Sequence, residues 1–85
     1  MKEFQYTIQD ENGVHARPAG LLVRKSQSFK SDASISYDEK RADLKRLFAV
    51  MGLNIKKGAQ VSVQISGVDE ENAAQELEDF MKNNL

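Results

Sequence analysis

Apolar and polar residues alternate along three stretches of the chain, and this period of two predicts β-strands with one buried face. A polar run at 40–43 follows an expected hairpin turn at Asp38 and Glu39 and predicts a fourth, shorter strand. Charged residues discourage further strand pairing, so we expect this short strand at an edge of the sheet. The apolar members of the three alternating stretches are Phe4, Tyr6 and Ile8, then Ala33, Ile35 and Tyr37, then Val61, Val63 and Ile65.

Three other segments have the apolar periodicity of helices. They are expected at about 16–28, at 44–53 and from Asp69 to Leu85, with Asp69 as the cap of the last helix. The order of elements is strand, helix, two strands, helix, strand, helix. This order predicts an α+β fold in which helices cover one face of a four-stranded antiparallel sheet. The residues of the first helix expected to face the core are Ala19, Leu22, Val23 and Ser26.

The second helical segment is apolar on nearly every side. Val50 and Leu53 are natural core residues, but a helix this short on a small sheet cannot bury all of its faces. We therefore expect some of Leu47, Phe48 and Met51 to reach solvent as an apolar patch. The apolar pattern by itself supports an ordinary, fully buried helix about equally well.

Composition excludes several classes of function. A net charge of −1 offers no bulk basic surface for nucleic acid, and the absence of cysteine excludes disulfides and thiolate metal sites. With a single histidine, we expect neither a metal site nor a cofactor. The N-terminal residues lack the apolar core of a signal peptide, and no run could span a membrane. We expect one cytoplasmic domain over residues 1–85.

The only histidine and the only proline lie together within residues 13–19. A strand precedes this stretch and a helix follows it, so His15 is expected where a loop becomes a helix. The unpaired N–H groups and the dipole of a helix start attract anions and disfavour a charged imidazolium, which favours a neutral, nucleophilic ring. Arg17 adds a fixed positive charge suited to phosphate oxygens. Pro18 is tolerated in a first turn but disfavours helical geometry before it, so the helix start stays open between Ala16 and Pro18.

One histidine beside one arginine is by itself a weak signal, because surface and capping histidines are common. Four motifs add specificity, namely Gly13-x-His15-Ala16-Arg17-Pro18-Ala19, Leu44-Lys45-x-Leu47-Phe48, Lys57-Gly58-Ala59 and Gly67-x-Asp69-Glu70. With these motifs at the family's spacing, the chain resembles the histidine-containing phosphocarrier proteins (HPr) of the bacterial sugar phosphotransferase system. The resemblance extends over essentially the whole chain.

The resemblance implies an open-faced sandwich of four strands and three helices, and a monomeric carrier of phosphoryl groups. Enzyme I, charged by phosphoenolpyruvate, would phosphorylate Nδ1 of His15, which would then pass the group to the A domain of a sugar permease. The chain would be a covalent intermediate and not a turnover enzyme. His15 and Arg17 would be the catalytic pair, and Ala16, Arg17 and Pro18 would hold the phosphate. The implied docking surface comprises Gly20, Leu21, Arg24, Leu47, Phe48 and Met51.

Leu21 supports this interpretation because it is an apolar residue on the arginine-bearing face of the first helix, on the same side as His15. A single exposed leucine carries little weight by itself. Beside a histidine that handles phosphate, a docking role becomes the better interpretation.

Arg46 departs from the family pattern. In many relatives the residue between Lys45 and Leu47 is a serine that a regulatory kinase phosphorylates, and arginine has no hydroxyl to modify. The chain therefore has no regulatory serine at this position. A regulatory paralogue that acts mainly as a protein-binding module is the alternative function, and the presence of His15 argues against it. The sequence leaves the sugar, the permease and the role of the loop at 9–13 open.

Overall fold

The computed structural model describes residues 1–85 and contains one four-stranded sheet. Its spatial order is β1-β4-β2-β3, and every neighbouring pair is antiparallel. The short polar strand β3 therefore lies at an edge, as its charges predict. The strands are β1 at Lys2–Thr7, β2 at Asp32–Tyr37, β3 at Lys40–Asp43 and β4 at Gln60–Ser66.

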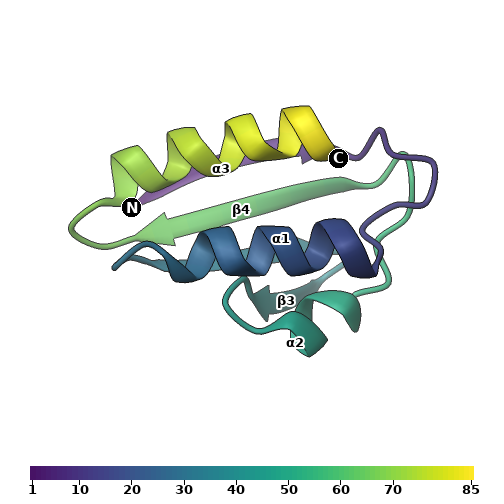
Figure 1. Cartoon of the computed structure of the whole chain (residues 1–85), viewed down its shortest axis with the longest axis horizontal. Coiled ribbons are helices and arrows are strands. Elements are labelled where there is room, and N and C mark those ends of the chain that lie inside the picture. Colours follow the sequence, from purple (N-terminus) through teal and green to yellow (C-terminus); the bar gives the residue numbers. More distant parts are fainter.

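Three helices complete the fold and lie on one face of the sheet (Figure 1). They are α1 at Ala16–Gln27, α2 at Leu47–Met51 and α3 at Glu70–Asn84. In Figure 1, α1 and α3 run beside each other along the sheet, and α2 lies at the side of β3. The predicted α+β open-faced sandwich is confirmed. None of its helices is both long and apolar enough to cross a membrane.

The helix boundaries settle one open question and correct one expectation. Helix α1 begins at Ala16, so Arg17 is helical although a proline follows it. Helix α2 begins three residues later than the expected Leu44. Leu44 instead continues the sheet, because its N–H donates to the Ala33 carbonyl over 2.9 Å and its side chain is fully buried. Leu44 also begins the turn that leads to α2, in which the Arg46 N–H donates to the Asp43 carbonyl over 3.1 Å.

The core lies between the sheet and the helices. Alternate residues of β2 and β4 point into it, and so does the predicted stripe of α1. These residues form one cluster with α3, in which the side chains of Leu77 and Met81 are fully buried. The buried members contributed by the sheet and α1 include Ala33, Ile35, Val61, Val63, Ile65, Ala19, Leu22 and Val23.

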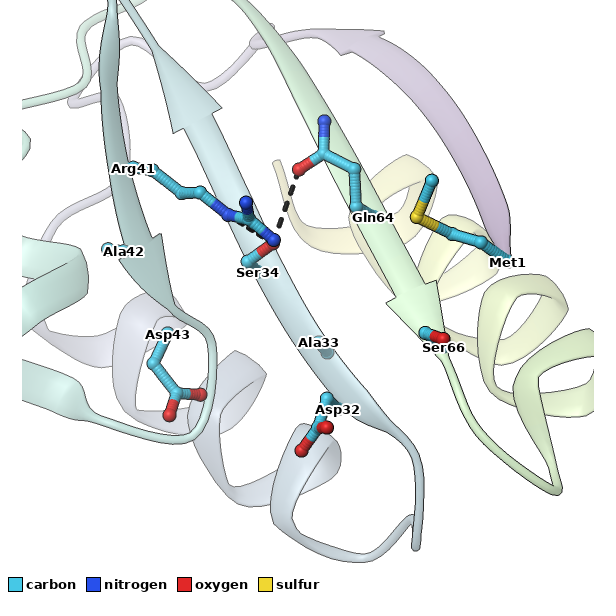
Figure 2. Close-up of a pocket in the computed structure, with 9 residues that line it drawn as sticks. All are labelled: Met1, Asp32, Ala33, Ser34, Arg41, Ala42, Asp43, Gln64 and Ser66. Carbon is cyan, nitrogen blue, oxygen red and sulfur yellow. Dashed lines mark hydrogen bonds between the residues drawn. The ribbon is translucent and has the colours of Figure 1, made fainter.

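The other face of the sheet is polar and carries no helix (Figure 2). Arg41 on β3 reaches across to Ser34 on β2, where its Nε donates to the hydroxyl oxygen over 3.0 Å. The Ser34 hydroxyl in turn donates to Oε1 of Gln64 on β4 over 3.2 Å. These side chains line a shallow hollow of ≈ 390 Å³ together with residues of the β2 start and the β4 end. Hydrogen bonding among the strands thus accounts for the polar composition of this face.

Asp69 joins two loops that are distant in sequence. It occupies the N-cap position of α3, but its side chain does not cap that helix as the sequence predicts. Its carboxylate instead accepts the N–H groups of Lys30 and Ser31, each over 2.9 Å, and the Ser31 hydroxyl. The hydrogen bond from the Ser31 hydroxyl, followed by that from the Lys30 N–H, lowers the pKa of Asp69 below its ordinary value.

This lowered pKa predicts a pH dependence of stability. A carboxyl group with a lower pKa in the folded state stabilises that state above its ordinary pKa, and the contribution is lost as the pH falls through the folded value. We expect Asp69→Asn to lower the melting temperature by a few degrees near neutral pH, and to have a smaller effect under strongly acidic conditions. Thermal melts across this pH range check the result. The exposed Asp32→Asn is the control, and an equal pH dependence in both variants would contradict the assignment.

Candidate functional site

The loop before α1 is held by a close backbone approach. Gly13 has a φ of 67°, a left-handed conformation that side chains disfavour, and an added Cβ would lie 2.8 Å from Cα of Lys56. The next residue, Val14, donates its N–H to the Ile55 carbonyl over 3.0 Å and buries its side chain. The loop therefore enters the helix in a fixed position, with His15 as the first residue past this contact.

His15 is the N-cap residue of α1. Its backbone is extended, with φ −93° and ψ 179°, and its carbonyl accepts the Ala19 N–H over 2.9 Å. The side chain makes no cap hydrogen bond and is 41% exposed. The imidazole thus stands at the positive end of the helix and is accessible to another protein.

The first turn of α1 suits an anion. The N–H groups of Ala16 and Arg17 have no intrahelical acceptor in this geometry, and Pro18 has no N–H to satisfy. The first turn contains no acidic residue that would compete for these groups. Backbone donors and the guanidinium of exposed Arg17 can therefore stabilise the negative charge of a phosphoryl group on His15.

A shallow hollow of ≈ 230 Å³ lies at this helix start. It brings together four residues singled out from the sequence, which are His15, Arg17, Pro18 and Leu21. The hollow is open and small, so it fits a group attached to His15 better than an enclosed small-molecule substrate. The complete lining is Asp10, His15, Arg17, Pro18, Leu21 and Asn84.

Next to the hollow lies an apolar face made of Leu21, Leu47, Phe48 and Met51. Phe48 is 87% exposed, Leu21 is 43% exposed and Met51 is 38% exposed, whereas Leu47 is partly buried against the core. Val50 and Leu53 are buried, as predicted. The expectation that part of α2 reaches solvent is confirmed, and the alternative of a fully buried helix is wrong.

Helices α1 and α2 pack against each other, so the helix that carries Leu21 adjoins the one that carries Leu47, Phe48 and Met51. The side-chain amide of Gln27 at the end of α1 donates to the Lys45 carbonyl over 2.9 Å, and the Lys45 ammonium donates to the Phe29 carbonyl over 3.0 Å. Gly20 and Arg24, the other residues expected to dock partners, are half-exposed and exposed, respectively, on α1. All six expected docking residues thus belong to two adjoining helices.

Arg46 is the N-cap residue of α2, and its side chain is 80% exposed. It makes no cap hydrogen bond, and its Nε is 3.9 Å from Oδ2 of Asp43. A cation at a helix start is mildly unfavourable because it faces the positive end of the dipole. Asp43 offsets part of this charge, and the guanidinium stays exposed at the start of α2.

Sequence reasoning missed two residues of the hollow, Asp10 and Asn84. Oδ1 of Asp10 is 3.7 Å from Nε2 of His15, and it also accepts the Asn12 N–H over 2.8 Å. The polar loop signal at 9–13 left open whether these residues meet the site or only turn the chain, and Asp10 does both. Asn84 comes from the far end of α3, so no local pattern could have placed it here.

Comparisons with known proteins agree with this geometry. The family model described as the PTS HPr component phosphorylation site matches residues 2–83. The phosphocarrier protein HPr of Lysinibacillus sphaericus is 43% identical over 77 residues, covering 91% of this chain and 88% of the relative. The histidine-containing phosphocarrier protein of Mycoplasma is 34% identical with a TM-score of 0.94, covering 96% of this chain and 93% of the other.

A more distant likeness is to Crh of Bacillus subtilis, a catabolite repression protein solved as a domain-swapped dimer. It is 27% identical, with a TM-score of 0.78, and the match covers all of this chain and 98% of the other. The family model nevertheless covers nearly all of this chain, and the phosphocarrier relatives are closer in sequence than Crh. The chain therefore belongs to the HPr family of phosphocarrier proteins.

Proposed function

We propose that the chain, as one domain over residues 1–85, accepts a phosphoryl group on His15 from Enzyme I and passes it to the A domain of a sugar permease. The observation that carries this proposal is an exposed histidine at the start of a helix, directly beside an exposed apolar face. The first feature supports reversible attachment of phosphate. The second supports docking of the proteins that supply and remove it.

The chemistry needs few groups. A neutral imidazole attacks the phosphorus, and the ring then carries the group as an N–P bond. The N–H groups of Ala16 and Arg17 and the Arg17 guanidinium stabilise the charge on the phosphoryl oxygens. Because the group must leave again, stabilisation by surface donors suits a carrier better than an enclosed site would.

Docking by the apolar face explains how two different partners can reach the same histidine. Each partner would cover Leu21 and Phe48 in turn and align its own reactive group with His15. The hollow on the polar face of the sheet takes no part, since its residues Asp32 and Ser66 pair at the end of the sheet away from the β1–α1 loop. We infer that the protein does this as a monomer and in the cytoplasm, where these partners act.

The alternative is a regulatory module of the Crh kind, which would bind proteins without carrying phosphoryl flux. The observation that supports this alternative is the likeness of the whole chain to Crh. The presence of His15 in an accessible position favours the carrier instead. Acid-labile phosphate on His15 distinguishes the two.

The first prediction concerns His15. We expect His15→Ala to abolish phosphate uptake from Enzyme I and phosphoenolpyruvate, because no other side chain at the helix start is a nucleophile of this kind. The melting temperature should stay the same, since the side chain is exposed and its loss opens no core cavity. Mass measurement before and after acid treatment checks uptake. A variant that still gains acid-labile phosphate would contradict the assignment.

The second prediction concerns the apolar face. Phe48→Ala should weaken binding to Enzyme I by about 1–3 kcal/mol, the range for a central interface residue, and should leave thermal stability nearly unchanged. Val68→Ala is a matched control, because Val68 is 88% exposed but lies in the loop between β4 and α3, away from His15. Calorimetric titration and thermal melts measure both variants. Equal losses of affinity, or a loss of stability with unchanged affinity at Phe48, would count against the docking role.

The third prediction concerns Arg46. A serine kinase that modifies other HPr proteins should not label this protein, because the residue at the start of α2 has no hydroxyl. The variant Arg46→Ser should become a substrate, and phosphate on it should be acid-stable. Incubation of both proteins with the kinase and ATP, followed by mass measurement, gives the answer. Acid-stable phosphate on the wild type would refute the claim.

A further inference from the structure

Asp10 lies beside the His15 ring, and we infer that it is a positioning residue that selects the ring tautomer used in phosphoryl transfer. Its Oδ1 is 3.7 Å from Nε2 of His15, and both residues line the hollow at the start of α1. The inference rests on the proposed carrier function. It adds a role for a residue outside the Gly13–Ala19 motif.

Asp10 is held in place by contacts that do not involve His15. Its N–H donates to a Leu85 backbone oxygen over 2.8 Å, and its carbonyl accepts the Gly13 N–H over 2.9 Å. Its Oδ1 accepts the Asn12 N–H over 2.8 Å, which fixes the carboxylate itself. The side chain is only 29% exposed. The carboxylate is therefore positioned before any partner binds, and the His15 ring can adjust to it.

A carboxylate at this position decides which nitrogen reacts. A neutral imidazole carries a proton on one ring nitrogen and a lone pair on the other, and a neighbouring hydrogen bond determines which. An ionised carboxylate only accepts hydrogen bonds, so Asp10 favours the tautomer with the proton on Nε2. The lone pair is then on Nδ1, the nitrogen that Asp10 does not face.

The same placement suits the transfer step. The Nδ1 lone pair forms the bond to phosphorus while the bond from phosphorus to the donor atom of Enzyme I breaks, and that electron pair leaves with the donor. The ring keeps its Nε2 proton and becomes a phosphoimidazolium cation. Asp10 lies on the Nε2 side, where its charge stabilises this cation without meeting the phosphoryl oxygens. Arg17, the other charged residue of the hollow, is left to meet those oxygens.

The distance of 3.7 Å between Nε2 of His15 and Oδ1 of Asp10 is longer than a hydrogen bond. A small rotation of the His15 ring would bring the two atoms within hydrogen-bond distance. Such contacts are often long in the free protein and tighten in the reactive complex. The alternative is a purely structural role, in which Asp10 only stabilises the turn by accepting the Asn12 N–H. Asp10→Asn separates the two roles, because an amide oxygen can still accept the Asn12 N–H but carries no charge to bias the ring.

The test uses two-bond proton–nitrogen NMR spectra of the labelled protein at a pH where the ring is neutral. The chain has one histidine, so a single set of signals reports the tautomer ratio. We expect Asp10→Asn to raise the fraction with the proton on Nδ1 about threefold, the scale of one weak charge-assisted hydrogen bond. Single-turnover phosphate uptake from Enzyme I should slow by a similar factor, while the melting temperature and Enzyme I affinity stay unchanged.

The control is Glu11→Gln, which removes an exposed charge from the neighbouring residue and should change neither the ratio nor the rate. An unchanged tautomer ratio in Asp10→Asn would overturn the inference, as would an equal change in Glu11→Gln. The spectra require no Enzyme I. A failure of the carrier function would show separately, as wild-type protein that takes up no phosphate.

Discussion

The contact of Gly13 and Val14 with the backbone of Ile55 is the constraint on which the functional surface depends. A side chain at residue 13 would collide with that backbone, and the left-handed φ of 67° would strain it as well. Val14, the residue directly before His15, extends this contact, because its N–H donates to the Ile55 carbonyl. Ile55 lies in the segment between α2 and β4, so the contact joins the loop before His15 to the segment that follows α2. The proposed phosphoryl acceptor and the proposed docking face therefore lie on segments that this contact holds together.

The residues that stabilise the fold and those of the candidate docking face lie in different parts of the structure. The sheet packs against α1 and α3 and buries a continuous core, with Leu22, Ile35 and Leu77 fully enclosed. Helix α2 contributes little to this core beyond Val50, which leaves Phe48 free to stay in solvent. An exposed phenylalanine does not stabilise a free protein. Its exposure is what the proposed docking of partner proteins would explain.

Much of this architecture follows from local sequence patterns. Alternation gave all the long strands, and the charges of 40–43 placed β3 at an edge, because these features depend on neighbours in the chain. The start of α2 was wrong by three residues because Leu44 pairs with Ala33, a contact that no local pattern encodes. The sequence predicts that Asp69 caps its own helix, but its carboxylate accepts the N–H groups of Lys30 and Ser31. These residues are distant in the chain, so no local pattern encodes this contact either.

The candidate site likewise combines residues that a local motif identifies with residues that only the tertiary structure brings together. The sequence singled out His15 and Arg17 because their position at a helix start suits phosphate chemistry and because the surrounding motif resembles that of the family. Asp10 was not singled out in this way, since its distance from the His15 ring depends on how the loop folds back between Gly13 and the end of α3. The sequence motif therefore identifies the proposed reactive group, and only the tertiary structure shows which carboxylate lies beside it.

Onward transfer of the phosphoryl group tests the central claim most directly, because it separates a carrier from a protein that is merely modified. The protein would be phosphorylated with isotopically labelled phosphoenolpyruvate, freed of Enzyme I, and mixed with the A domain of a sugar permease. The account predicts that label moves to the A domain and that the chain returns to its unmodified mass. Label that stays on the chain, or appears only as free phosphate at the rate seen without the A domain, would contradict it.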